Sequence, residues 1–138
     1  MSKYRGTIKQ LNMYNAVISY CMCTTLIRQY LKMFEEGVEE EQFMDNLKMD
    51  VDCFLADSER YNEEFENLPA TEIDDNYLRI SSSACAAGVK VIYAEDCIGV
   101  LKEEGLAGLY AKLNEDLPAY IEHGKELDKE LKDSYNNN

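Results

Sequence analysis

Apolar side chains recur at steps of three and four residues along most of the chain, and no stretch alternates apolar with polar positions. Steps of three and four residues place side chains on one face of an α-helix, whereas alternation is typical of a strand. The pattern divides the chain into four helical stretches of similar length: about 7–34, 39–66, 72–103 and 106–134. We therefore predict an all-α protein, an antiparallel four-helix bundle in which 1–138 is a single domain and 136–138 is a frayed tail.

The first helical stretch is apolar round most of its circumference. One apolar stripe includes Val17 and Ile27, and a second stripe on another face includes Leu11 and Leu26. Such a helix belongs at the centre of a bundle or at an interface with a second copy of the chain. The uncharged run within it, residues 10–27, is too short and too rich in amides and hydroxyls to span a membrane or to serve as a signal peptide. We expect a soluble, cytoplasmic protein with no membrane partner.

The third and fourth stretches carry two local predictions. The third has the strictest repeat, and its middle, residues 81–88, contains only small side chains. Small residues let helix axes approach, so we predict a close helix crossing at Gly88, with a ligand pocket above the small residues as the alternative. In the fourth stretch Pro118 closely follows Asp116, a pattern that predicts a kink or a fresh helix start near Pro118. After Gly124 the apolar stripe thins, so this end is expected to be the least stable.

Residues suited to catalysis or metal binding are sparse. His123 is the one histidine, and Tyr120 stands three residues before it, where a di-iron bundle would need a glutamate. No Gly-rich phosphate loop follows a strand, and no basic cluster flanks a thiol to activate it. The thiols are scattered without a C-x-x-C pair and are expected to be small buried side chains in a reducing compartment: Cys21, Cys23, Cys53, Cys85 and Cys97. We expect no enzyme, no cofactor and no metal.

Charge is sorted by segment along the chain, which has a net charge of −13. Residues 1–34 contain five basic side chains and no carboxylate, whereas residues 35–76 contain sixteen carboxylates and two bases, Lys48 and Arg60. A merely soluble helix would interleave both signs, and a block of one sign costs stability through self-repulsion. Such a block attracts basic protein surfaces and repels nucleic acid and anionic membranes.

The acidic side chains of the second stretch are the candidate partner-binding surface. Five of them fall opposite its apolar stripe and three lie in its first turn: Asp45, Asp52, Glu59, Glu63, Glu66, Glu39, Glu40 and Glu41. Carboxylates along this stretch occur about once per 4 Å of helix axis, close to the one charge per about 3.4 Å on a DNA strand. The sequence therefore favours a non-enzymatic inhibitor that mimics nucleic acid and occupies a basic surface on another protein, as phage anti-defence proteins do.

Several alternatives stay open. The acidic face is a solvated surface without a partner in the simplest reading. A second functional reading is a cytosolic immunity-type or chaperone-type protein for one cognate partner. A third is a homo-oligomeric bundle that forms a homodimer through the first helix. The basic residues Lys3, Arg5 and Lys9 could also pair with the acidic stretch, within one chain or across a dimer.

Overall fold

The computed structural model describes residues 6–69 and 73–136, which form three helices and no strand. Helix α1 spans Ile8–Glu35, α2 spans Glu40–Glu66 and α3 spans Asp75–Asn136. The all-α prediction is confirmed. Four separate helices are not confirmed, because the residues assigned to the third and fourth stretches belong to one long helix, α3. The start expected for the third stretch at residue 72, and the end of the frayed tail, lie outside the described residues.

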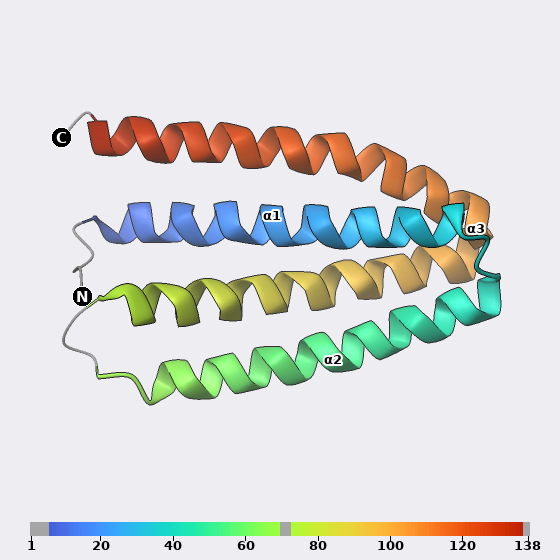
Figure 1. The fold of residues 1–138 in the computed structure, drawn as a ribbon, viewed down its shortest axis with the longest axis horizontal. Coiled ribbons are helices and arrows are strands. Elements are labelled where there is room, and N and C mark those ends of the chain that lie inside the picture. The colour runs from blue at the N-terminus through green and yellow to red at the C-terminus, as the bar shows by residue number, and fades with distance from the viewer. Residues whose placement is uncertain (1–5, 70–72, 137–138) are drawn as a thin grey trace.

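Helix α3 is interrupted at Gly105, whose backbone has φ 72° and ψ −168°. Glycine is essentially the only residue that adopts this conformation, because a β-carbon would clash with the backbone. At Gly105 the chain folds back, so that residues 75–104, the first arm, and 106–136, the second arm, run in opposite directions (Figure 1). The arms contact each other through the rings of Tyr93 and Tyr120, whose centroids are 5.6 Å apart.

A fresh helix start near Pro118 is not observed. Helix α3 continues through Pro118, and its one non-helical residue is Gly105. The Asp116 side chain does not cap a new helix, because it accepts hydrogen bonds from Tyr93 and Lys112 instead. A proline inside a helix removes one backbone donor, whereas a chain reversal needs backbone angles outside the helical region, and Gly105 supplies them.

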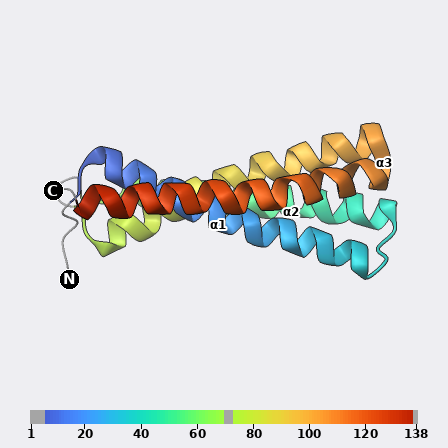
Figure 2. The ribbon, with the colours of Figure 1, turned by 90° about the horizontal axis from the view of Figure 1, so that it is seen from above.

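The main apolar core lies at one end of the elongated molecule. The α1–α2 connection and the reversal at Gly105 are both at this end, which we call the closed end, and the start of α1 and the end of α3 are at the opposite, open end (Figure 1). Side chains from all three helices meet in the core of the closed end: Leu26, Ile27, Tyr30, Phe43, Leu47, Tyr93, Cys97, Leu101, Leu109 and Leu113. Seen from above, α1 and the first arm of α3 cross along the rod (Figure 2).

The open end buries polar side chains beside a few large apolar ones, Leu11, Ile80 and Leu131. Asn15, Ser19, Ser81 and Ser82 are all buried there. Gln10 is buried as well; its Nε2 donates to Ser134 Oγ at 3.0 Å and ties the start of α1 to the end of α3. Buried polar pairs of this kind contribute less than apolar packing, because the side chains give up bonds to water on folding.

The predicted close crossing at Gly88 is wrong. Ser81, Ser82, Ala86 and Ala87 are buried, so part of the small-residue segment does pack against neighbours. A β-carbon on Gly88, however, would meet no atom within 4 Å. The large side chains expected to fill the space above residues 81–88 therefore do not reach Gly88, and the helix surface there faces open space.

Replacing Gly105 by alanine tests the reversal. Gly105→Ala forces a β-carbon into a backbone region that costs about 1–3 kcal/mol, so the free energy of unfolding should fall by that amount in chemical denaturation. Gly99→Ala is the matched control, since Gly99 lies in the helical first arm and a β-carbon there meets nothing within 4 Å. The control should gain roughly 0.5–1 kcal/mol. Equal effects at both positions would contradict the reversal.

Candidate functional site

All eight acidic residues expected to bind a partner lie on the surface of the molecule. Each has an exposed side chain in the α2 segment: Glu39, Glu40, Glu41, Asp45, Asp52, Glu59, Glu63 and Glu66. Helix α2 as a whole carries ten carboxylates and two bases. The structure thus places the predicted residues where a partner could reach them, although they do not all lie on one face of α2.

Six of the eight share a single face of α2. Asp45, Asp52, Glu59 and Glu66 follow one another at intervals of seven residues, which is close to two helical turns, so their side chains point in nearly the same direction. Glu41 and Glu63 fall on the same face by the same helical periodicity. We call these six residues the acidic stripe. It runs along almost the full length of α2.

Glu39 and Glu40 lie outside the acidic stripe. Glu39 is the N-cap residue of α2 and makes no side-chain capping bond. The Oε1 atom of Glu40 is 3.3 Å from the position that a β-carbon on Gly105 would take, so this carboxylate lies against the reversal of α3. A negative charge is favourable there, because the second arm begins at this point with unpaired backbone N–H groups. Glu40 has a structural neighbour and is a weaker candidate for partner contact.

The basic side chains of α2 leave the acidic stripe largely uncompensated. Arg60 Nη2 lies 3.3 Å from Asp57 Oδ1, and the guanidinium lies over the Tyr61 ring at 4.8 Å. Four ion pairs among the described residues each join side chains three or four positions apart in one helix. The pairing expected between the basic N-terminal segment and the acidic stretch involves Lys3 and Arg5, which lie outside the described residues. Lys9 is exposed on α1.

Asp50 is acidic but faces inward, toward α1. Its Oδ2 accepts a hydrogen bond from Tyr30 Oη at 2.8 Å and one from Asn46 Nδ2 at 3.3 Å. Tyr30 is 1% exposed, so its phenol needs a partner inside the molecule. This carboxylate links α1 to α2 and is not available to another protein.

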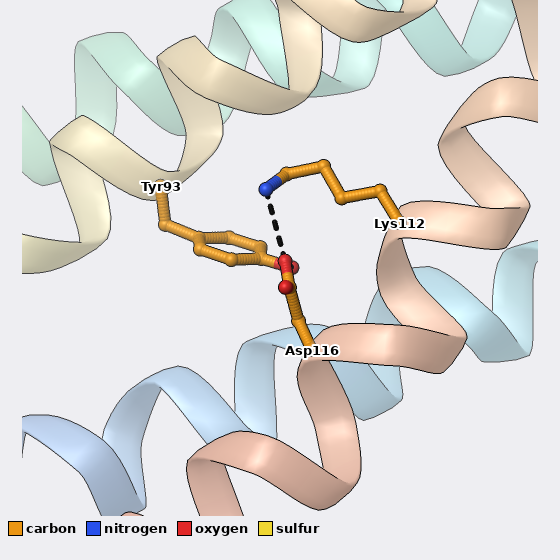
Figure 3. Close-up of polar contacts among 3 residues, drawn as sticks. All are labelled: Tyr93, Lys112 and Asp116. Atoms are coloured by element: carbon orange, nitrogen blue, oxygen red, sulfur yellow. Dashed lines mark hydrogen bonds and ion pairs between the residues drawn. The ribbon is translucent and has the colours of Figure 1, made fainter.

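A second tyrosine–aspartate pair links the two arms of α3 (Figure 3). Tyr93 Oη donates to Asp116 Oδ2 at 2.8 Å, and Lys112 Nζ donates to the same oxygen at 2.9 Å. The Lys112 ammonium also lies 4.9 Å from the centre of the Tyr93 ring, within the range of a cation–π contact. The sequence pattern missed Tyr93, because it lies one position before Ala94 in the predicted apolar repeat.

The titration of this cluster points to structure and away from catalysis. Burial raises the pKa of Tyr93 above its ordinary value, and neighbouring Cys97 and the bond to Asp116 act in the same direction. Burial likewise raises the pKa of the Cys97 thiol to about 12. A general base or thiolate nucleophile needs a pKa near the working pH. Both groups stay protonated at neutral pH, so the cluster holds the arms of α3 together.

The thiols differ in part from expectation. Cys23 and Cys97 are buried as predicted, but Cys21, Cys53 and Cys85 are exposed. All five are free thiols. The side chain of His123 is 60% exposed, and its ring stacks on Tyr20 at 6.0 Å.

Within residues 6–69 and 73–136, no three Cys, His, Asp or Glu side chains are grouped so that they could hold a metal ion. In the same residues, no helix combines the length and apolar character needed to cross a lipid bilayer. No protein family, characterised protein or solved structure matches the chain. Function therefore has to be argued from the geometry of this molecule.

The tyrosine–aspartate pairs predict how stability depends on pH. Above about pH 10 an unfolded chain releases the Tyr93 proton while the folded chain keeps it, so the free energy of unfolding falls as pH rises, by up to about 1.4 kcal/mol per pH unit. Below about pH 10 the full contribution of the Tyr93 phenol to the free energy of unfolding is present. Tyr93→Phe should lower stability at neutral pH by about 1.5–3 kcal/mol, through loss of a bond to a carboxylate, and should flatten the decline above pH 10.

Urea denaturation across neutral to alkaline pH measures both effects. Tyr110→Phe is the control, since Tyr110 is 49% exposed and its ring contact with Phe34 survives the change. If the curves of the wild type and Tyr93→Phe stay parallel above pH 10, the buried phenol does not have the role described.

Proposed function

We propose that this chain is a non-enzymatic binding protein that presents the acidic stripe of α2 to a basic, nucleic-acid-binding type of surface on another protein. The observation that carries the proposal is the arrangement of six carboxylates on one exposed face, Glu41 to Glu66, with the nearby Arg60 already paired to Asp57. Carboxylates on a rigid helix keep fixed spacings, which a basic groove can match. An inhibitor that imitates nucleic acid is the concrete form, of the kind that phages use against host defence.

Charge density supports mimicry of an electrostatic field. Helix α2 has 27 residues and ten carboxylates, which amounts to about one charge per 4 Å of axis, against about 3.4 Å on one DNA strand. The acidic stripe alone carries about one charge per 6 Å. The helix therefore matches the charge density of a DNA strand, but the acidic stripe does not match the regular spacing of the phosphates. We expect the partner to bind these carboxylates through flexible lysine and arginine side chains.

The architecture also suits presentation of a charged rod. We propose that α1, α2 and the two arms of α3 work as an antiparallel four-helix bundle, with α2 on its outside. Within the described residues the fully buried side chains of α2 are Phe43 and Leu47, both near its start. The remainder of α2 leaves its carboxylates free of internal contacts, apart from Asp50 and Asp57.

An immunity-type or chaperone-type protein for one cognate partner remains the second candidate, and the acidic stripe would serve it equally. A homodimer through α1 has less support. Leu26, Ile27 and Tyr30 of α1 are already buried within the chain, and its exposed large apolar side chains, Ile8 and Met22, lie far apart on the helix. An interface needs a contiguous apolar patch.

Charge reversal tests the proposal. A variant with Asp45, Asp52, Glu59, Glu63 and Glu66 all changed to lysine should fold, since exposed positions usually tolerate substitution within about 0.5 kcal/mol each. It should lose the basic proteins that the immobilised wild type captures from a bacterial lysate at low salt. A control variant reverses five exposed carboxylates on α3 to give the same net charge: Glu95, Glu103, Glu115, Glu122 and Glu130. The control should keep its capture.

Two further measurements sharpen the result. Duplex DNA should displace the captured protein, and capture should weaken as the Debye length shrinks from about 10 Å at 0.1 M salt to about 3 Å at 1 M. A folded stripe variant that captures the same proteins as the wild type would remove the proposal. Capture that depends on the stripe but resists DNA would favour an immunity-type partner.

A further inference from the structure

A cavity of about 400 Å³ lies at the open end of the molecule, away from α2. Residues of α1 form one wall and residues of both arms of α3 form the others: Asn12, Asn15, Ala16, Ser19, Tyr20, Cys85, Val89 and Tyr120. The volume lies in the range of small-molecule sites, about 300–1,000 Å³. The cavity and the acidic stripe share no residue, so the two sites are independent.

The small-residue segment explains why the cavity exists. Between Ser81 and Gly88 the first arm of α3 has no large side chain, and a β-carbon on Gly88 would meet nothing within 4 Å. Tyr20 and Tyr120 do not fill this space, because their rings pack edge to face on each other at 5.5 Å. The space opens to solvent, since Asn12, Cys85 and Val89 in its lining are exposed.

Asn15 gives the cavity a polar feature that packing does not explain. The residue is 8% exposed, and its Nδ2 donates to Ser81 Oγ at 2.9 Å. Its Oδ1 is buried and has no hydrogen-bond partner among the described residues. Buried polar atoms are almost always paired, so an unpaired acceptor beside a cavity marks a place for a donor that arrives with a ligand.

We propose that this cavity binds a flat, uncharged aromatic molecule that carries one hydrogen-bond donor, such as an indole or a phenol. The rings of Tyr20 and Tyr120 supply aromatic walls, and Ala16 and Val89 supply aliphatic surface. The carboxamide of Asn15 turns toward the cavity to accept the ligand's N–H or O–H, because its Oδ1 is buried in the empty protein. Among the described residues, no lysine, arginine, aspartate or glutamate lines the cavity, so a charged ligand would lose its hydration there without gaining a partner.

Labelling of Cys85 reports occupancy directly. Cys85 lines the cavity, whereas Cys53 is an exposed thiol on α2 that does not, so one molecule holds both probe and control. The wild type is treated with a maleimide at mildly alkaline pH, with and without indole, and each site is followed by peptide mass spectrometry. Indole at ten times its dissociation constant should slow labelling of Cys85 about tenfold, because reaction needs the free form. Labelling of Cys53 should not change.

Two comparisons test whether Asn15 accepts a hydrogen bond from the ligand and whether the ligand binds inside the cavity. N-methylindole has the same shape but no donor, and should bind about tenfold more weakly than indole; Asn15→Leu should abolish that preference. Ala16→Phe places a ring in the cavity and should remove protection of Cys85, whereas Ala111→Phe at an exposed position should not. Equal labelling of Cys85 with and without indole up to its solubility limit would overturn the proposal. Equal slowing at Cys53 would show non-specific binding and overturn it too.

Discussion

Phe43 and Leu47 have no exposed surface, and through them α2 joins the core that α1 and both arms of α3 form at the closed end. Phe43 packs against Phe34 at 4.9 Å and against Tyr30 at 6.2 Å between ring centres. Full burial of one such side chain contributes about 1.5–3 kcal/mol. Mutual repulsion along ten carboxylates opposes this gain. The acidic helix therefore stays in place because its first turns are anchored, and its later turns are held only by half-buried contacts such as Phe65 on Tyr77.

Two tyrosine–aspartate bonds complement this apolar anchor. Tyr30 and Asp50 join α1 to α2, and Tyr93 and Asp116 join the arms of α3. In each pair a buried ring contributes apolar area while its hydroxyl reaches a carboxylate nearer the surface, so no polar group is left unpaired in the core. At the open end amides and hydroxyls are buried beside Leu11, Ile80 and Leu131. A cavity there is lined by Asn15, whose Oδ1 has no partner among the described residues. The closed and open ends of the molecule thus differ in the kinds of side chain that the same helices bury.

Sequence periodicity predicted the helical class and the ranges of α1 and α2 to within one residue, because three-and-four spacing of apolar residues is a direct consequence of helical geometry. It also placed the acidic residues correctly on the surface. It did not predict that Gly105 would reverse α3 while Pro118 would not, since the backbone angle of a glycine depends on tertiary contacts. The sequence allowed a pocket above residues 81–88 as the alternative to a close crossing, but it could not decide between the two, because the outcome depends on where Tyr20 and Tyr120 pack.

Hydrogen exchange along α2 tests whether the acidic helix is anchored at one end and exposed along the rest. Amide protection reflects the free energy of local opening, which follows buried apolar contact. Amides around Phe43 and Leu47 should exchange near the rate set by global unfolding, and protection should decline steadily toward Glu66. Amides of α1 around Ile27, buried in the same core, provide the internal reference. Uniform strong protection over the whole of α2 would contradict this picture, because the fully buried side chains of α2 are Phe43 and Leu47, and residues 50–66 add only half-buried contacts such as Phe65 on Tyr77.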